Sequence, residues 1–532
     1  MSNRIGRYFQ SVGFRKGDCV ALIMDGRPEY VCSWLGLSKI GVVTALVNTT
    51  QRGDSLRHSL DIVRAKAVLL GTEYSDVCPE VCEDIPGFRL FAMGGGRTPP
   101  GAVSLDQVLP RISAETLSKE IDKQNFKDQL LYIYTSGTTG LPKAAIITNA
   151  RAVFMGYGVH CMAGIGPEDV LYTPLPLYHT AGGVIGAGAA VLSGATVVIR
   201  SKFSASNFWK DCVRYDCTAA QYIGEICRYL LATPPSEDDR RHRVRIMFGN
   251  GLRPQIWQEF VTRFRIPTVG EFYGSTEGNA NLINIWNKVG SVGYVPWFAK
   301  PFYPLKLLKV DPETNEILRD ANGRCIRCRQ GEPGVLVGDI NKKKIVTNFN
   351  GYVDKGATEQ KILRDVFRKG DSYFNTGDIL VEGELGYLYF KDRTGDTFRW
   401  RGENISTSEV EAVISNIVGL KDVIVYGVEI PNVEGRAGMA AILDESKSLD
   451  WSRLEEGMRR KLSSFARPLF VRILRQLPMT STFKLKKIDL QKEGYNPNLI
   501  QDPLYFFDSK SGTYTRLTPQ LYDEIVSNVV RL

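Results

Sequence analysis

Short apolar runs alternate with helix-like stretches over the first part of the chain. Residues 19–24, 42–48 and 65–70 are strand-like, whereas residues 28–40 and 55–63 have the apolar spacing of helices. The alternation resumes after residue 145, with strand-like runs at 196–200, 217–223, 245–250 and 268–274. Alternating strands and helices predict an α/β fold with buried parallel sheets. Because such sheets bind ligands at the carboxyl ends of their strands, polar motifs at those ends are candidates for a site.

The pattern changes after about residue 300. Gly-rich turns separate short alternating strands as far as residue 390, which predicts a β-rich subdomain. A polar, turn-rich segment then leads into an amphipathic helix capped by the residues Ser406 to Ser408. We therefore expect an N-terminal domain over residues 1–393 and a small α+β C-terminal domain over residues 394–532.

Residues 181–199 are uncharged over nearly the length that spans a bilayer. The segment contains five glycines and breaks at Ser193-Gly194 before a β-branched run. A buried helix followed by a core strand explains this pattern, and contact with a membrane is the alternative.

Composition limits the class of protein. The chain has 532 residues, of which 43% are hydrophobic, so it can bury large cores and is a globular protein of several domains. Its formal charge of +9 is spread over 67 basic and 58 acidic residues, which favours polyanionic ligands or an anionic membrane over nucleic acid. The ten cysteines, including the CxxC pair Cys325 and Cys328, are expected to be reduced thiols. The first residues lack the apolar core of a secretory signal.

One loop, YTSGTTGLPK from Tyr134 to Lys143, has the composition of a phosphate-binding segment. Glycines allow close approach of the backbone, hydroxyls donate hydrogen bonds and a lysine adds positive charge. A mobile turn without a ligand can have the same composition. A Walker loop is excluded, because Leu141-Pro142 separates the last glycine from the lysine. The loop residues suited to phosphate are Thr135, Ser136, Gly137, Thr138, Thr139, Gly140 and Lys143.

Further segments carry isolated polar side chains suited to the rest of a nucleotide. In EFYGSTEGN, Glu277 is a hard oxygen ligand for Mg²⁺ and Thr276 a donor to phosphate. In NTGD, Asp378 can accept hydrogen bonds from both hydroxyls of a ribose. Arg393 in DRTGD and Lys484 in TSTFKLKK add positive charge, although each of these residues alone also fits a solvated surface. No Ser/His/Asp or Cys/His arrangement is evident, so we expect catalysis by positioning and charge stabilisation.

Taken in order, these segments resemble the core motifs of the adenylate-forming superfamily, which includes acyl-CoA synthetases, luciferases and peptide-synthetase adenylation domains. The motifs are YTSGTTGLPK, LPLYHTAGG, FGNGLRP, EFYGSTEGN, NTGD, DRTGDTFRWRGEN and TSTFK, and they extend over nearly the whole chain. GNGLRPQIW, FYGSTEGN, DRTGDTFRWRGENISTSEVE and LYFFDSKSGTYTRLT are similar to the fatty acid transport protein, or very-long-chain acyl-CoA synthetase, family in particular. Each motif is short, and the assignment depends on their order and spacing.

The resemblance implies an acyl-CoA synthetase-like fold whose small C-terminal domain moves about a hinge near residues 393–395. A fatty acid carboxylate would attack the α-phosphate of ATP, giving acyl-adenylate and pyrophosphate, and the thiol of CoA would then displace AMP. Attack of one anion on another needs compensating positive charge, which Mg²⁺ and Lys484 together could supply. The two steps need different neighbours around the reacting atoms, so a hinge lets one cleft serve both.

The resemblance also implies roles for individual residues. Thr276 would contact the α-phosphate, Glu277 would bind Mg²⁺, and Asp378 and Arg393 would bind the ribose. Lys484 would bridge the carboxylate and the α-phosphate in the first step. The loop from Tyr134 to Lys143 would hold the β- and γ-phosphates, and the adenine pocket would be lined by Gly249, Asn250, Gly251, Leu252, Glu271, Phe272 and Tyr273, followed by Gly274 and Ser275.

Two further residues are placed by the same comparison of motifs. His179 would lie near the carboxylate site, with a packed core histidine as the alternative. Gly402 would lie beside the pantetheine tunnel of CoA, with a simple turn glycine as the alternative.

Three features depart from the family pattern. The usual hinge sequence Gly-Arg-x-Asp-Asp is Asp-Arg-Thr-Gly-Asp here, and its Gly395 suits a large backbone rotation. Lys484 follows Ser-Thr-Phe instead of the usual glycine. Family members generally carry an N-terminal membrane segment, and its absence points to a short form or a truncated gene model that attaches peripherally through an apolar or basic surface.

We therefore expect a long- or very-long-chain fatty acid CoA ligase that uses ATP, Mg²⁺ and CoA and promotes uptake by trapping the acid. The alternatives are an adenylating enzyme for aromatic or amino acids and a membrane-associated fatty acid carrier with weak or vestigial ligase activity. The expected location is a membrane surface, of the endoplasmic reticulum or plasma membrane with the peroxisome as an alternative, and the catalytic domains are expected to be cytosolic. Nucleic acid is not an expected partner, and a homodimer is compatible with the sequence.

Overall fold

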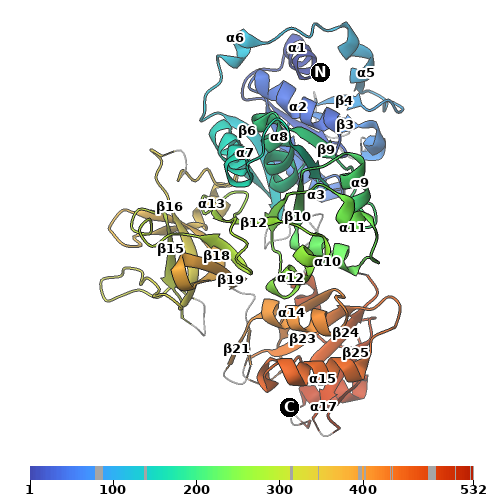
Figure 1. Cartoon of the computed structure of the whole chain (residues 1–532), viewed down its shortest axis with the longest axis vertical. Coiled ribbons are helices and arrows are strands. Elements are labelled where there is room, and N and C mark those ends of the chain that lie inside the picture. The colour runs from blue at the N-terminus through green and yellow to red at the C-terminus, as the bar shows by residue number, and fades with distance from the viewer. Residues whose placement is uncertain are drawn as a thin grey trace. The chain divides into compact units, whose positions relative to one another are not determined.

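The computed structural model of the chain divides into two compact units (Figure 1). The first unit contains residues 1–252, 259–288 and 338–376, and the second contains residues 253–258, 289–337 and 377–532. The residues that the structure describes are 1–77, 88–136, 141–311, 316–344, 347–393, 398–400, 403–431, 433, 435–476, 487–509, 511–527 and 529–530.

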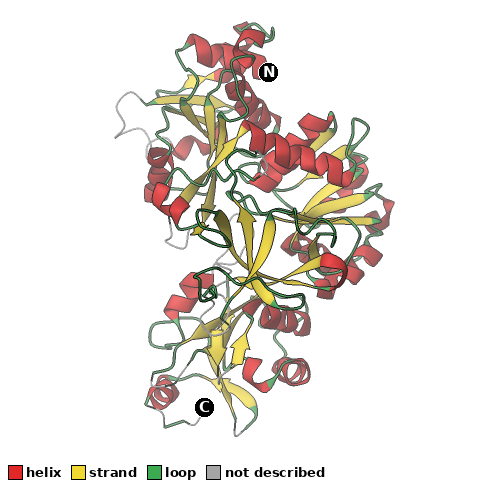
Figure 2. Ribbon diagram, turned by 90° about the vertical axis from the view of Figure 1, so that its left-hand side faces the viewer, coloured by secondary structure: helices red, strands yellow, loops and turns green. Residues whose placement is uncertain are grey.

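The first unit contains two mainly parallel sheets, and Figure 2 shows the strands of the chain in yellow and its helices in red. The first sheet has the order β5-β4-β3-β1-β2-β6-β7, and only β6 and β7 pair antiparallel. Its strands are β1 (Cys19–Ile23), β2 (Val43–Leu46), β3 (Ala67–Gly71), β4 (Arg89–Met93), β5 (Val103–Ser104), β6 (Gln129–Ser136) and β7 (Pro142–Thr148). The first three strand-like runs of the sequence are therefore confirmed as adjacent parallel strands.

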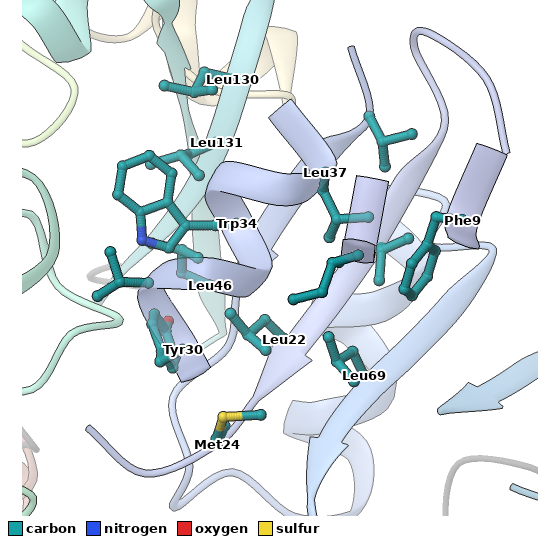
Figure 3. Packing of buried hydrophobic residues seen from close by; sticks show 14 of the residues in the cluster. Phe9, Leu22, Met24, Tyr30, Trp34, Leu37, Leu46, Leu69, Leu130 and Leu131 are labelled. Carbon is teal, nitrogen blue, oxygen red and sulfur yellow. The ribbon is translucent and has the colours of Figure 1, made fainter. Parts of the chain in front are cut away.

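Helices cover both faces of this sheet. Successive side chains of β1 alternate between two cores, so that Val20 and Leu22 pack with α1 and α2, whereas Ala21 and Ile23 pack with α3. Figure 3 shows the first of these cores, where Trp34 on α2 lies among apolar residues of the sheet. The helices of this part are α1 (Ser2–Ser11), α2 (Pro28–Lys39), α3 (Gly53–Ile62), η1 (Thr72–Val77), α5 (Leu105–Val108), η2 (Leu109–Arg111), α6 (Ser118–Ile121) and α7 (Asn149–Ala163).

The second sheet has the order β13-β12-β11-β10-β8-β9 and is parallel except for β13. Its strands are β8 (Val170–Thr173), β9 (Thr196–Ile199), β10 (Ala219–Ile223), β11 (Ile246–Asn250), β12 (Thr268–Tyr273) and β13 (Leu282–Asn284). The helices around it are η3 (Ala181–Gly188), α8 (Ala189–Ser193), α9 (Phe208–Arg214), α10 (Gly224–Ala232), α11 (Asp238–Arg241) and α12 (Pro254–Arg263).

The uncharged segment 181–199 is a helix followed by a strand, as the sequence predicts, but β9 is a partly exposed edge strand and not a core strand, and the end of the helix exposes Val191 and Leu192. The π-helix η3 continues directly into α8, because the residues at their junction have right-handed helical backbone angles. Gly194, with φ +74°, ends the helix and turns the chain into β9. Among the residues described, no helix combines the length and the apolar character needed to cross a membrane.

A third sheet confirms the predicted β-rich region. It has the order β14-β19-β18-β16-β15, with β17 paired to β18. Its strands are β14 (Ser291–Tyr294), β15 (Leu305–Lys309), β16 (Pro333–Asp339), β17 (Ile362–Arg364), β18 (Ser372–Glu382) and β19 (Tyr387–Arg393). The helical turns of this region are α13 (Lys355–Glu359) and η4 (Glu384–Gly386).

The C-terminal part has a five-stranded sheet in the order β22-β23-β24-β25-β26, preceded by a hairpin of β20 (Phe398–Trp400) and β21 (Glu403–Ile405). Helix α14 (Thr407–Ile417) begins after Ser406, whose hydroxyl accepts the Glu409 N–H, as the capping pattern predicts. The remaining elements are β22 (Val423–Val428), β23 (Ala437–Leu443), α15 (Trp451–Lys461), η5 (Ser464–Ala466), β24 (Phe470–Leu474), α16 (Lys487–Glu493), β25 (Leu504–Asp508), β26 (Thr513–Arg516) and α17 (Pro519–Val526).

Candidate functional site

The hairpin of β6 and β7 carries the two ends of the predicted phosphate loop. Thr135 pairs with Lys143 across the hairpin, and its hydroxyl lies 3.5 Å from the Lys143 carbonyl oxygen. The Tyr134 side chain is buried and donates to the Ser59 carbonyl oxygen at 2.5 Å, and burial raises its pKa. Gly137, Thr138, Thr139, Gly140 and the side chain of Ser136 lie outside the described residues. The described base of the loop thus places a threonine and a lysine on adjacent strands.

Residues 351–353 lie against β7 and fix the position of Tyr352. The Ile146 N–H donates to the Gly351 carbonyl oxygen at 3.0 Å, and the Val353 N–H donates to the Ala144 carbonyl oxygen at 2.9 Å. The Tyr352 N–H donates to the Thr358 hydroxyl at 2.9 Å. These bonds hold the tyrosine backbone on both sides of its side chain.

The Tyr352 hydroxyl joins two motifs that are distant in the sequence. It lies close enough to both for the Glu277 carboxylate to raise its pKa and for the Thr135 hydroxyl to lower it. Lys143 Nζ lies 5.9 Å from the centre of its ring. Burial and the negative charge of Glu277 raise the pKa of Tyr352, so it stays protonated as a donor at neutral pH. No motif of the sequence singled out this tyrosine.

Arg151, at the start of α7, anchors the backbone beside Glu277. Its Nη2 donates to the carbonyl oxygens of Ser275, at 3.0 Å, and Thr276, at 2.8 Å, and its Nε lies 3.2 Å from the latter. Burial lowers the pKa of Arg151 to about 10, and the charge of Glu277 opposes that shift. No local pattern indicates this arginine, because its contacts depend on the way α7 meets the segment after β12.

The Thr276 side chain is also held. Its hydroxyl lies 3.0 Å from the hydroxyl of Thr180, which directly precedes η3. The neighbouring His179 is half-buried; its ring packs on Tyr178 at 4.6 Å between centres, and its carbonyl oxygen accepts the Gly183 N–H at 2.8 Å. The start of the uncharged helical segment therefore borders the residue predicted to contact the α-phosphate.

The carboxyl ends of β10, β11 and β12 meet around Glu271. This carboxylate is buried and accepts hydrogen bonds from the Tyr222 hydroxyl and from the N–H groups of Gly251 and Leu252. Burial raises the pKa of Glu271 to about 8, although these donors favour the charged form. Its side chain thus holds the turn after β11, where Gly251 has φ +87°, in the segment predicted to line an adenine pocket.

In the neighbouring segments, Asn250 ends β11, and Phe272 and Tyr273 end β12 after Glu271. Gly274 and Ser275 follow β12, and the Ser275 hydroxyl accepts the Gly278 N–H at 3.2 Å. The segments predicted to line the adenine pocket and the predicted α-phosphate contact Thr276 therefore follow adjacent strands, β11 and β12, of the second sheet.

Asp378 and Arg393 are partners on adjacent strands of the second unit. They face each other in the pairing of β18 with β19, and Arg393 Nε donates to Asp378 Oδ1 at 3.0 Å. Asp378 is buried, whereas the Arg393 side chain is 57% exposed. The predicted ribose ligands therefore form one ion pair with one accessible cation.

Two predicted residues, Gly402 and Lys484, lie outside the described residues. Over the part of the chain that the structure describes, no group of three or more His, Cys, Asp or Glu side chains is placed to hold a metal ion. Eight cysteines in that part are not joined in disulfides, and their reduced state stays a prediction.

Two family models match the chain. The model of the AMP-binding enzyme family covers residues 1–337, and that of the AMP-binding enzyme C-terminal domain covers residues 409–484. The chain is therefore an enzyme of the adenylate-forming class.

Close relatives narrow this class. Long-chain fatty acid transport protein 1 of Homo sapiens is 48% identical over 535 residues, which cover 100% of this chain and 83% of the relative. Long-chain fatty acid transport protein 2 of Rattus norvegicus is 42% identical over 537 residues, with 100% and 86% covered. The chain belongs to the long-chain fatty acid transport protein family, as the sequence motifs indicate.

Solved structures confirm the expected fold class. The anthranilate CoA ligase AuaEII in complex with anthranoyl-AMP superposes with a TM-score of 0.76 at 19% identity, covering 92% of this chain and 90% of the other. ATP-bound MatB from Rhodopseudomonas palustris gives a TM-score of 0.75 at 21% identity, with 92% and 91% covered. The chain therefore has the fold of acyl-CoA synthetase-like enzymes.

Proposed function

We propose that the chain converts long- or very-long-chain fatty acids to their CoA esters through an acyl-adenylate and thereby traps them after uptake. The observation that carries the proposal is the junction at Tyr352, which joins Thr135 of the phosphate loop to Glu277 beside Lys143. A pure carrier has no need of these residues. The printed names of the relatives, long-chain fatty acid transport proteins, support the choice of substrate.

In the first step, a carboxylate oxygen of the fatty acid attacks the α-phosphorus of ATP. A new carboxylate–phosphorus bond forms, the bond to the bridging oxygen breaks, and pyrophosphate leaves. The loop from Thr135 to Lys143 would hold the departing pyrophosphate, and the Thr276 hydroxyl would donate to the α-phosphate. Arg151 fixes the Thr276 backbone and leaves a buried positive charge near the phosphates, which favours their binding.

The residues around Glu277 fit a Mg²⁺ ion that is shared with ATP. The Glu277 carboxylate is partly exposed and lies near the Tyr352 hydroxyl, and its oxygen lone pairs can bind a cation. The described residues supply no ring of carboxylates around it. One carboxylate with phosphate oxygens and water is the usual ligand set of Mg²⁺ on a nucleotide, and the ion would neutralise charge on the phosphates.

The remaining assignments complete the two-step reaction. Asp378 and Arg393 would bind the ribose, and Lys484 would neutralise the carboxylate and α-phosphate as they meet. After the small domain turns about residues 393–395, the CoA sulfur attacks the acyl carbonyl carbon and AMP leaves with the electron pair of the broken bond. His179 would border the carboxylate, and Gly402 would leave room for the pantetheine chain.

The test is an ATP–pyrophosphate exchange assay with fatty acids of increasing chain length, with CoA esters measured in parallel. We expect exchange that depends on a long-chain acid. Lys484→Ala is expected to lower exchange about 100-fold or more while ATP still binds, because a charge aimed at the reacting atoms is lost. Lys492→Ala, at an exposed lysine on α16, is the control and is expected to keep full activity.

Two results would contradict the proposal. The first is folded protein that shows no exchange dependent on a fatty acid. A membrane-associated carrier would then be the better function, and its fatty acid binding would be measured directly. Exchange with aromatic or amino acids but not with fatty acids would assign a different substrate to the same chemistry.

A further inference from the structure

Five exposed apolar side chains gather on the packed helices α7 and α8 of the first unit. Their exposed fractions range from 37% to 51%, and we call this surface the α7–α8 face. Its residues are Val153, Phe154 and Tyr157 of α7 and Val191 and Leu192 of α8. The helices touch closely, because a Cβ placed on Gly156 would lie 2.8 Å from Leu192 Cδ1. The two sets of side chains therefore belong to one continuous surface.

The segments that build this face lack charge. Between residues 149 and 167 the only Asp, Glu, Lys or Arg is Arg151, which is buried, and residues 170–199 contain none. A soluble surface of this kind usually carries charged residues between its apolar ones. Water contact with an apolar face is costly, so such a face indicates a partner that is itself apolar.

One edge of the face carries an exposed aromatic residue and, next to it, a lysine. Phe126, 64% exposed, lies at the start of α7, where its carbonyl oxygen accepts the Ala150 N–H at 2.9 Å. The next residue is Lys127, which is exposed. An apolar face with a cation at its rim, on a chain of net charge +9, suits an anionic lipid surface.

The same helical segment leads to the candidate site. Helical turns continue from Ala181 through Leu192. The residue before them is Thr180, whose hydroxyl lies 3.0 Å from the Thr276 hydroxyl. The exposed residues Val191 and Leu192 lie at the far end of this helical segment from Thr180. The face is therefore one short helix away from the residue proposed to contact the α-phosphate.

We propose that the α7–α8 face docks the chain on the surface of a lipid bilayer, with both helices lying in the interface. The proposal rests on the proposed function, because a long-chain fatty acid partitions into bilayers and must reach the site from there. A bilayer fits better than a protein partner, since protein interfaces pair an apolar centre with a rim of hydrogen-bonding groups, and α7 and α8 offer few of these. Contact with a membrane through segment 181–199 is then superficial, through Val191 and Leu192.

The experiment is flotation of the 532-residue chain with phosphatidylcholine vesicles, alone and mixed with phosphatidylserine. The test variant is Phe154→Asp combined with Leu192→Asp, because a carboxylate on the face would have to enter the acyl region. We expect the bound fraction to fall about tenfold or more. Leu499→Asp, at a 79% exposed leucine of the second unit, is the matched control and is expected to bind like the parent.

A second variant and an activity measurement distinguish a loss of docking from misfolding. Tyr157→Asp changes the most exposed side chain of the face, 51% exposed, and is expected to weaken flotation in the same direction. Both variants are expected to keep pyrophosphate exchange with monomeric fatty acid and to lose rate when the acid is supplied in vesicles. Flotation without any exchange would support docking and remove the proposed ligase function alone.

Three results would overturn the proposal. The first is a parent chain that floats with neither kind of vesicle, and the second is flotation of the face variants equal to that of the parent. A parent dimer that the face variants convert to a monomer, without vesicle binding, would assign the face to a second copy of the chain.

Discussion

At the scale of single residues, Tyr352 is the contact on which the proposed phosphate site depends. Tyr352→Phe removes the hydroxyl that interacts with Glu277 and Thr135 but keeps the ring beside Lys143. A hydrogen bond to a charged group contributes about 1.5–3 kcal/mol. We therefore expect pyrophosphate exchange to fall about tenfold or more, mainly through a higher KM for Mg·ATP, as measured by initial rates at varied nucleotide concentration.

The control for this prediction is Tyr132→Phe. Tyr132 lies on the same strand as Thr135, and its hydroxyl donates to Gln129 Oε1 at 2.7 Å, away from the proposed phosphate contacts. We expect its removal to leave the KM for Mg·ATP unchanged. Equal losses in the two variants would show that the Tyr352 hydroxyl has no particular role in nucleotide binding.

Glu271 should make stability depend on pH. Its pKa is raised to about 8 by burial, whereas an unfolded glutamate titrates near about 4.3, so the folded chain binds the extra proton between these values. The stability from this group is full below about pH 4.3 and is lost as pH rises through about 8, with a slope of up to about 1.4 kcal/mol per pH unit.

Glu271→Gln removes this titration while keeping an acceptor for the Gly251 N–H and a polar group beside Tyr222. We expect the urea midpoint of the variant to fall less between pH 5 and about 8 than that of the parent. The measurement compares urea denaturation of both proteins across that range. Parallel pH profiles would mean that Glu271 is charged throughout.

At the scale of secondary-structure elements, two glycines let the ends of β10 and β11 approach each other. A Cβ on Gly249 would overlap the Tyr222 carbonyl oxygen, and a Cβ on Gly224 would overlap that of Gly251. We expect Gly224→Ala to destabilise the chain by about 1–3 kcal/mol and to weaken ATP binding, because the turn held by Glu271 must move.

The control is Gly158→Ala on α7, where an added Cβ meets no atom within 4 Å. In a helix this change is expected to stabilise by about 0.5–1 kcal/mol. Urea midpoints and ATP titrations of both variants check the pair of predictions. A Gly224→Ala protein as stable as the parent would show that the two turns separate without cost.

The elements themselves were largely predictable, and their contacts were not. Strands such as β1 and β11 are apolar runs whose pattern depends only on neighbouring residues, so the sequence alone indicates them. Arg151 and Tyr352 have no such local signal, because each becomes relevant only when distant segments meet. Glu271 illustrates the same limit: its motif indicated the right neighbourhood, but its carboxylate turns inward to backbone N–H groups.

At the scale of the whole molecule, the two-step reaction requires a C-terminal domain that stays folded while it moves. The buried core of the five-stranded sheet draws its members from residues 398–525 alone, including Ile424, Leu454 and Phe470. Within the described residues, its five strands pair with one another and with no other named strand. These features are what an independently folding domain needs. The boundary near residues 393–395 stays a prediction, because the second compact unit also contains residues 253–258, 289–337 and 377–393.

We therefore expect a fragment of residues 394–532 to fold by itself, since a domain of about this size buries roughly two thirds of its surface. Circular dichroism during urea denaturation should show one cooperative transition. Ile424→Asp, which places a carboxylate in the core at a fully buried position of β22, is expected to abolish it. If the fragment unfolds without a cooperative transition, the domain boundary lies elsewhere than residues 393–395. The rotation that brings CoA to the acyl-adenylate would then need a hinge at another position in the chain.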